Sequence, residues 1–468
     1  MLYNKITLKI MISSLRRSES ELDFLKLNVR FYLILCLVIM LGLLSACIRE
    51  PIDGLNYTKT DVVEIDFWYG LSGHLGETMK EFIDEYNQQQ SKVRVVGVAQ
   101  GNYEKTAQAL RASIVRRKPP AVVLLEDQRM QFFANVGALS PLDSLINVNA
   151  DFHKEDFVDS FLQQGQFKGN TYALPAYGTT QVLYYRKDLF TIAGIKPDTL
   201  DTWEGLAKAA KKLTMKNGQE VLVYGWEPIQ GPENLIDAAI SRGGKFLSAD
   251  GKTVTIDGRA WIEAWEYFRR AIHEEKTMKV NYGGEGWEYW YATIHDVIQG
   301  RAAGYTGSSG DQGELDFSII EAHIQPSWEG YAGYPRAVAH ARALCIPQDV
   351  PQVQREAAFE WIKYMTSSEI TAQWSIKTGY LPVRNSAMTT DSYQKFAEEN
   401  PQIMVPYHQT KLATKVFFDP TGGKIYDALK VAAEKVEIQN VPAEIALQEA
   451  KETSQGELDK ALAGGDSL

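Results

Sequence analysis

Carboxylate, hydroxyl and aromatic side chains stand where predicted strands end, and together they could bind a polyhydroxylated molecule. Glu126 and Asp127 directly follow the apolar run 121–125 and can accept hydrogen bonds, whereas Thr179 and Ser308 carry hydroxyls that donate and accept. The candidate aromatic plates are Tyr103, Trp226, Trp287 and Tyr380. Acceptors, mixed donors and an aromatic plate are what a solute with many hydroxyls and one apolar face requires. This set therefore predicts a site of the sugar-binding kind.

Each candidate also has a purely structural interpretation. Glu126 at a strand end could complement the dipole of a following helix. Aromatic residues dominate hydrophobic cores, so Trp226 and Trp287 could be packing residues in a chain that holds 10 Trp and 23 Tyr. Trp203 at the start of a predicted helix is expected to pack in the core.

Strands alternate with helices through the first part of the chain. The strands are expected at residues 62–70, 93–98 and 121–125, and the helices between them at 77–88 and 103–115. This alternation predicts a parallel, doubly wound sheet, in which ligands bind beyond the carboxyl ends of the strands. Those ends are residues 68–74, 100–103 and 126–127, which brings Tyr103 close to the two carboxylates.

Residues 171–213 contain the longest motif in the sequence. A strand around residues 182–185 leads into Arg186-Lys187-Asp188 and a short helix that Gly194 ends. Pro197 prevents the helix from resuming, and Thr202 caps a longer helix that begins with Trp203. The chain therefore passes from a strand through a short helix to a capped helix.

Two later segments complete a set of three motifs. Gly300-Arg301-Ala302 follows a helix and leads into a strand that ends in Ser308-Ser309-Gly310, and Gly379-Tyr380-Leu381-Pro382-Val383-Arg384 follows another helix. With residues 171–213 they resemble the family 1 extracellular solute-binding proteins, and the similarity spans residues 62–450. The resemblance implies an α/β, periplasmic-binding-protein-like type II fold, with two lobes that each hold a doubly wound sheet and are joined by a hinge. It also implies a monomer without enzymatic activity that hands a solute to the permease subunits of a membrane ABC importer.

The resemblance also places the lobe boundaries. The N-terminal lobe is expected at residues 61–180 with 337–383, and the C-terminal lobe at 181–336 with 384–468. Hinge strands are expected at residues 175–183, 336–342 and 382–385, because the motifs fall where the chain crosses between lobes.

Within the family, the cleft segments are most similar to those of the glycerol-3-phosphate-binding members. Two differences from those members bear on the nature of the solute. Where they have a Gly-Gly-Ala-Ser segment, this chain has Ala339-His340-Ala341-Arg342. The position of their phosphate-binding arginine corresponds to the region of Phe417-Phe418 in this chain. Arg336, Arg342 or Arg384 could replace that arginine, yet losing a bidentate guanidinium favours a neutral saccharide or polyol. sn-Glycerol-3-phosphate or its diesters is the alternative. The predicted ligand-binding residues are Tyr103, Glu126, Asp127, Thr179, Trp226, Trp287, Ser308, His340, Tyr380 and Arg384.

The first 46 residues are typical of a bacterial lipoprotein signal peptide. Six basic residues precede the apolar run 31–44, which is too short to span a membrane comfortably, and Leu44-Ser45-Ala46-Cys47 follows at the cleavage position. The sequence therefore predicts lipidation of Cys47, a polar tether at residues 47–60, and an extracytoplasmic protein anchored to the bacterial membrane. A plain secretory signal with a chance cysteine is the alternative.

Charge and cysteine content exclude several classes of function. The whole chain has a formal net charge of −10, and residues 1–46 contribute +3. The chain without those residues therefore has a net charge of −13, which disfavours nucleic acid as a partner. Cys345 is then the one cysteine besides Cys47, so no disulfide is expected within the folded domain. The seven histidines show no metal-ligand spacing, so no metal and no cofactor are expected. A secreted glycan-active enzyme remains the rival class, since the separation of a carboxylate pair cannot be seen in a sequence.

Overall fold

The structure, a computed structural model of the chain, describes residues 62–464. The predicted signal peptide, the lipidation site at Cys47 and the tether at residues 47–60 lie outside the described residues. Within residues 62–464, no helix is both long enough and apolar enough to cross a membrane.

The first lobe is organised around a six-stranded sheet. Its spatial order is β14 (Ala413–Lys415), β13 (Ala337–Cys345), β3 (Val122–Glu126), β1 (Val63–Tyr69) and β2 (Val93–Ala99), with β6 (Ala173–Thr179) paired to β13. β1 runs parallel to β2 and β3, whereas β13 runs antiparallel to β3 and β6. The parallel strands β1, β2 and β3 all end at the same edge of the sheet, as the strand–helix alternation predicts.

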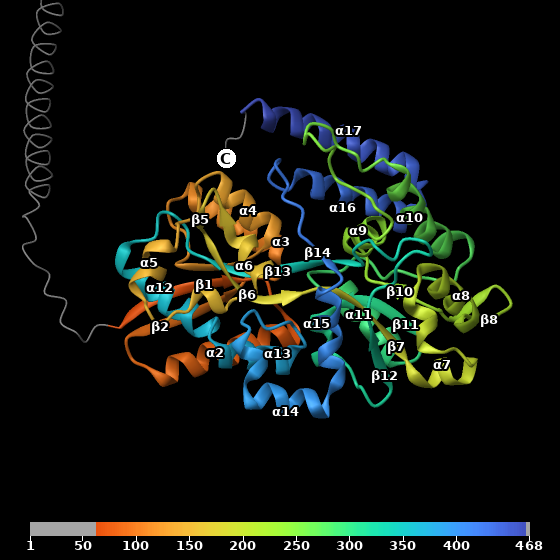
Figure 1. Cartoon of the computed structure of the whole chain (residues 1–468), viewed down its shortest axis with the longest axis horizontal. Helices are drawn as coiled ribbons and strands as arrows, with labels where there is room; N and C mark the ends of the chain where they lie inside the picture. Colours follow the sequence, from red (N-terminus) through yellow and green to blue (C-terminus); the bar gives the residue numbers. More distant parts are fainter. Residues whose placement is uncertain (1–61, 465–468) are drawn as a thin grey trace, which may run out of the picture. The chain divides into compact units, whose positions relative to one another are not determined.

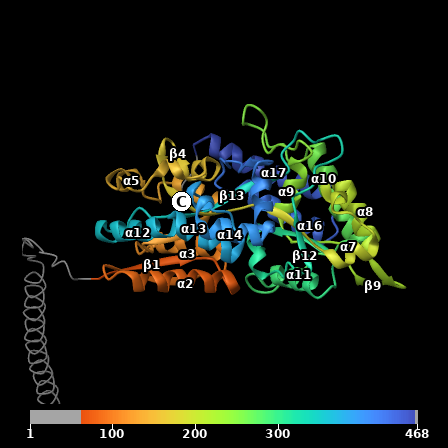
Figure 2. The ribbon, with the colours of Figure 1, turned by 60° about the horizontal axis from the view of Figure 1, so that its bottom comes forward.

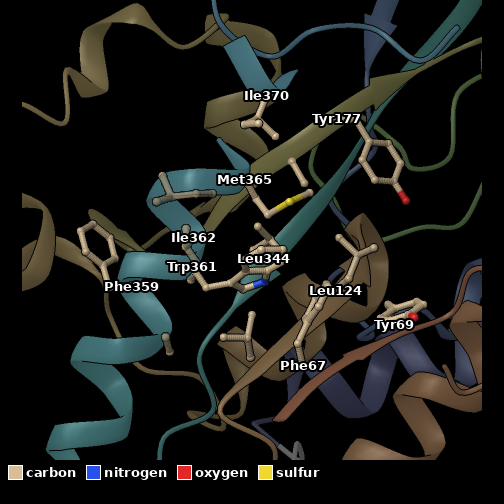
Figure 3. Close-up of a cluster of buried hydrophobic side chains, with 14 of the residues drawn as sticks. Phe67, Tyr69, Leu124, Tyr177, Leu344, Phe359, Trp361, Ile362, Met365 and Ile370 are labelled. Atoms are coloured by element: carbon tan, nitrogen blue, oxygen red, sulfur yellow. The ribbon is translucent and has the colours of Figure 1, made fainter. Parts of the chain in front are cut away.

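Helices cover this sheet and bury a core that depends on α12. They are α2 (Gly73–Gln89), α3 (Tyr103–Val115), α4 (Asp127–Asn135), α5 (Asp143–Val148), α6 (Asp159–Leu162), α12 (Gln352–Met365), α13 (Ser368–Thr378) and α14 (Asp391–Glu399). Figure 3 shows side chains of α12 facing residues of β1, β3 and β13. The ring centroid of Trp361 lies 5.6 Å from that of Phe67, and both side chains are buried.

The second lobe holds a smaller sheet. Its order is β10 (Glu227–Pro228), β11 (Gly304–Ser308), β7 (Gln181–Arg186) and β12 (Ile320–His323). β7 is antiparallel to both β11 and β12. The helices are α7 (Lys187–Ala193), α8 (Trp203–Leu213), α9 (Pro232–Ile240), α10 (Arg259–Arg269), α11 (Glu288–Ile298), α16 (Lys424–Glu437) and α17 (Ala443–Leu462).

The remaining elements are short. α15 (Met404–Thr410) lies close to β7, β13 and β14. Two small hairpins pair β4 (Gln166–Phe167) with β5 (Asn170–Thr171) and β8 (Met215–Asn217) with β9 (Glu220–Val223). Single 3₁₀ or π turns span Lys154–Asp156, Gln163–Gly165, Pro197–Asp201, Arg270–Glu274, Ser309–Glu314, Ser386–Thr389 and Pro401–Ile403. β9 is only partly buried in its hairpin.

The two lobes lie side by side within residues 62–464, with α5 and α12 at one end and α7 and α8 at the other (Figure 1). The same order is seen from a second direction (Figure 2). Separate hydrophobic clusters fill the lobes, one around Phe67 and Trp361 and the other around Trp203 and Trp265. The predicted two-lobed α/β architecture is confirmed.

The chain passes from the first sheet to the second at Thr180, between β6 and β7. The segment 382–385 behaves differently from the hinge expected there, because it pairs with the first lobe. The amide of Val158 donates to the carbonyl of Val383 at 2.8 Å, and the amide of Asn385 donates to the carbonyl of Asp156 at 2.8 Å.

The residues that follow this segment also stay with the first lobe. Tyr393 on α14 packs in one buried cluster with Ala372 on α13. We therefore propose that the C-terminal division between the lobes lies beyond residue 399, and not at residue 384.

Replacing Trp361 with alanine should destabilise the first lobe by roughly 3 to 5 kcal/mol, because the change removes a large, fully buried side chain and leaves a cavity. Urea denaturation followed by circular dichroism measures the shift of the midpoint. Val431→Ala is the control, since Val431 is 56% exposed and its truncation should change stability by less than about 0.5 kcal/mol. Equal midpoints for the two variants would contradict this account of the core.

Candidate functional site

Tyr103 forms the first-lobe wall of a cleft between the lobes. It is the first residue of α3, which the Asn102 side chain caps by accepting a hydrogen bond from the Lys105 amide at 2.8 Å. The backbone of Asn102 lies against residue 70, which must therefore be a glycine: a Cβ there would lie 2.3 Å from the Asn102 carbonyl carbon. The Tyr103 hydroxyl is 2.7 Å from that of Tyr177, which fixes the ring at the cleft.

β13 contributes a histidine and an arginine side chain that meet one buried carboxylate. His340 and Arg342 are two residues apart on the strand, so they project from the same face. Asp127 accepts a hydrogen bond from His340 Nδ1 at 2.6 Å, and Arg342 Nη1 lies 3.9 Å from the same carboxylate oxygen. The guanidinium of Arg342 also lies over the Tyr103 ring, 5.0 Å from its centroid. The segment that departs from the glycerol-3-phosphate pattern is thus part of the site.

The two neighbouring carboxylates have different electrostatic environments. Burial raises the pKa of Glu126 above its ordinary value, although Arg342 opposes this shift. Burial also acts to raise the pKa of Asp127, but the charge and hydrogen bond of His340, with help from Arg342, outweigh it and hold that pKa below its usual value. Asp127 therefore serves as the counter-ion of Arg342 and as the hydrogen-bond acceptor of His340.

Hydroxyl and amide groups line the junction of the two sheets. The Thr179 hydroxyl, at the end of β6, is 2.9 Å from that of Ser308, at the end of β11. Gln181, the first residue of β7, stands opposite Ser308 in the strand register. These residues form the hinge end of the cleft.

The second lobe supplies an aromatic segment that covers the cleft. Residues 282–291 contain three glycines with positive φ, at 283, 284 and 286, immediately before Trp287. The Trp287 ring stands edge-on to Tyr103 at a centroid distance of 5.9 Å, and its Nε1 donates to the Gly70 carbonyl at 3.3 Å. Tyr291 donates to the Ser72 carbonyl at 3.2 Å. We call residues 282–291 the aromatic lid.

Ion pairs join the lobes at the opposite rim. Arg129 on α4 pairs with Asp427 on α16 at 2.6 Å, and Glu104 on α3 pairs with Lys430 on α16. The structure is therefore a closed form, in which the cleft encloses about 480 Å³.

Seven of the ten predicted ligand-binding residues line this cleft. They are Tyr103, Glu126, Asp127, Thr179, Trp287, Ser308 and His340. Two others lie close by but support the cleft rather than line it. Tyr380 packs on Tyr177 with a centroid distance of 4.5 Å and lies directly against Gly310. Trp226 is buried in the core of the second lobe, where its Nε1 donates to the Thr306 hydroxyl at 2.8 Å.

Arg384 is placed away from the cleft, so its predicted role is corrected. Its guanidinium donates to the carbonyls of His153 and Phe152, at 2.9 Å each, and to that of Thr366. It also lies over the Phe157 ring, 4.1 Å from the centroid. Arg384 holds first-lobe loops together, because buried carbonyls need donors that the local backbone does not supply.

The cleft also contains residues that were not predicted as ligands. Arg342, considered only as a substitute for a missing arginine, stands with Gln181, Glu233, Tyr426 and Lys430. The alternation of β13 could have indicated Arg342, since it shares a face with His340. Within residues 62–464, no cluster of three or more His, Cys, Asp or Glu side chains could hold a metal ion. The arrangement offers acceptors, donors and an aromatic wall, which suit binding of a small solute.

Comparison with known proteins agrees with this geometry. A family model described as bacterial extracellular solute-binding protein matches residues 81–403, more than half of the chain. The chain belongs to this family. Among its relatives, the sn-glycerol-3-phosphate-binding periplasmic protein UgpB of Yersinia pestis is 25% identical over 423 residues, which cover 87% of this chain and 92% of the relative. The Brucella melitensis protein of the same name is 25% identical over 378 residues, which cover 78% of this chain and 84% of the relative.

Solved structures share the fold of this solute-binding protein. The Mycobacterium tuberculosis UgpB structure in complex with glycerophosphocholine has a TM-score of 0.75 at 23% identity, over 85% of this chain and 99% of that chain. The maltodextrin-binding domain MalE of Bdellovibrio bacteriovorus, bound to maltotriose, has a TM-score of 0.72 at 17% identity, over 85% of this chain and 100% of that chain. The predicted family and fold are confirmed.

Asp127→Asn should lower the free energy of unfolding by about 2 kcal/mol at pH 7, because it removes the anion beside His340 and Arg342. A carboxylate whose pKa is depressed by folding stabilises the protein above its unfolded pKa of about 4, and that contribution is lost as the pH falls through the folded pKa. Urea denaturation of both proteins from pH 7 to pH 3 should show the difference shrinking below about pH 4. A difference that stays constant with pH would contradict the counter-ion role.

Proposed function

We propose that this solute-binding protein captures a neutral saccharide or glycerol-type polyol between its lobes and hands it to the permease subunits of an ABC importer. It acts as a monomer, tethered to the bacterial membrane by a lipid on Cys47. Membership of the extracellular solute-binding family supports capture outside the cytoplasm. The charged residues that line the cleft bear on the nature of the solute.

The observation that carries the proposal is the balance of charge in the cleft. Arg342 is matched by Asp127 and by the neighbouring Glu126, while Arg129 and Lys430 are engaged in ion pairs across the rim. A phosphate group binds best to a guanidinium that no carboxylate already neutralises. A neutral hydroxylated solute can use the same carboxylates as acceptors, so it fits this cleft better.

The alternative solute is sn-glycerol-3-phosphate or one of its diesters. The names of the Yersinia and Brucella relatives favour it. The arginine expected near the C-terminus is absent, however, and aromatic residues occupy that position. Phe417 stacks face to face on Phe246 at a centroid distance of 4.3 Å, and Phe418 stacks on Phe167 at 5.8 Å. Phenylalanine side chains have neither a positive charge nor a hydrogen-bond donor with which to bind phosphate.

A thermal-shift panel of maltose, maltotriose, trehalose, ribitol, glycerol and sn-glycerol-3-phosphate tests the solute class. A neutral member should raise the melting temperature, since a ligand at a hundred times its Kd stabilises the folded state by about 2.7 kcal/mol. Calorimetry then gives the affinity, and chromatography of the mixture should return the ligand unaltered, whereas products would show an enzyme.

Micromolar or tighter binding of sn-glycerol-3-phosphate, abolished by Arg342→Ala, would show that Arg342 acts as a phosphate grip. That result would contradict the preference for a neutral solute. Arg384→Ala is the control, because Arg384 lies away from the cleft and its loss should leave affinity unchanged.

Cys47→Ala should release the protein from the membrane fraction of the host cell, because the Leu-Ser-Ala-Cys motif would then lack its lipidation site. Fractionation followed by immunoblotting measures the distribution. Cys345→Ala is the matched control and should remain with the membrane, since Cys345 is buried in β13. Retention of the Cys47→Ala protein on the membrane would contradict the anchor.

A further inference from the structure

Two buried polar atoms at the cleft lack hydrogen-bond partners within the described residues. One is Oε1 of Gln181, a residue that is only 7% exposed. The other is Nη1 of Arg342. Both residues line the cleft between the lobes. Buried donors and acceptors are nearly always satisfied in folded proteins, so an unsatisfied pair in a binding cleft indicates a missing partner.

The two residues reach the cleft from different lobes. Gln181 begins β7 in the second sheet, opposite Ser308 on β11. Arg342 lies on β13 in the first sheet, opposite Glu126 on β3. The Thr179–Ser308 contact joins the two sheets between them. A solute that contacts both side chains therefore bridges the lobes at the hinge end.

The chemistry of this pair restricts the group that can satisfy it. Gln181 Oε1 can only accept a hydrogen bond, whereas Arg342 Nη1 can only donate. A fully ionised phosphate group offers acceptors alone and would leave Oε1 of Gln181 unsatisfied. Two hydroxyl groups of one solute can do both, because one can donate to the glutamine while the other accepts from the guanidinium.

We infer that Gln181 and Arg342 together recognise two hydroxyl groups on the bound solute and so determine its specificity. This assignment rests on the proposed function, since it requires a polyhydroxylated ligand. Glu126 stands beside Arg342 and accepts from a further hydroxyl. Because the hydroxyl pair is held by both lobes, a solute that lacks it binds without stabilising the closed form.

Gln181→Met tests the assignment, because methionine has nearly the same length and volume but cannot accept this hydrogen bond. The probe is whichever of maltose, maltotriose, trehalose and ribitol raises the melting temperature of the wild-type protein most. Calorimetry should show an affinity about ten- to a hundredfold lower for the variant, which corresponds to the loss of one buried hydrogen bond. The unliganded melting temperature should stay the same or rise, since an unsatisfied buried polar atom has been removed.

Gln131→Met is the matched control. Gln131 Oε1 is also buried without a partner in the described part of the chain, but it lies on α4 away from the cleft walls. Its replacement should leave affinity unchanged. Gln181→Asn, which withdraws the amide by one methylene, serves as a second variant in case the methionine protein fails to fold, and it should also lose about tenfold in affinity.

The experiment gives different results if the role of Gln181 is wrong and if the proposed function is wrong. A neutral probe that binds the wild type and Gln181→Met within about twofold overturns the role of Gln181 while the proposed function stands. A wild-type protein that binds none of the neutral probes contradicts the proposed function, and with it the recognition of a hydroxyl pair.

Discussion

The buried guanidinium of Arg342 is the constraint around which the cleft is arranged. A cation removed from water needs compensation, and here it comes from the Asp127 carboxylate, from Glu126 on the neighbouring strand and from the face of the Tyr103 ring. His340 shares Asp127 with it. Because these partners already balance its charge, we propose that Arg342 acts on a ligand as a directional donor more than as an unpaired charge. This balance is the physical reason for assigning a neutral solute.

Closure of the lobes completes a site that neither lobe holds alone. The aromatic lid brings Trp287 against Tyr103 and is tied to the first lobe through the Gly70 and Ser72 carbonyls. α16 closes the other rim through Asp427 and Lys430. Both sets of contacts hold the two lobes together around the cleft. We propose that capture and release are coupled to one opening motion about the strands near Thr180.

Local sequence patterns allowed much of the fold and part of the site to be predicted. The alternation of strands and helices placed Tyr103 and Glu126 at the carboxyl ends of β1 to β3, where the cleft lies. Gly379 follows the end of α13 as the motif indicated, yet Arg384 in the same segment donates to carbonyls of residues more than two hundred positions earlier, which no local pattern reveals. Motif similarity alone placed it in the cleft.

Other parts of the site depend on long-range packing. α16 was not predicted, and it carries Tyr426 and Lys430 into the cleft from the far end of the chain. Gln181 begins an otherwise apolar strand and looks like an ordinary strand-end polar residue until its unsatisfied oxygen is seen. Trp226 has the size of a ligand plate but fills the space that Gly304 leaves in the core. Burial of this kind follows from tertiary structure and not from local propensity.

We propose that the cleft holds a neutral, polyhydroxylated solute between Arg342 and Gln181. The most direct measurement is mass spectrometry of the ligand released by denaturing the protein after isolation from its own host. The account predicts a compound of carbon, hydrogen and oxygen with several hydroxyl groups, released by the wild type and depleted in Gln181→Met. A phosphorus-containing ligand, retained equally by both proteins, would contradict it.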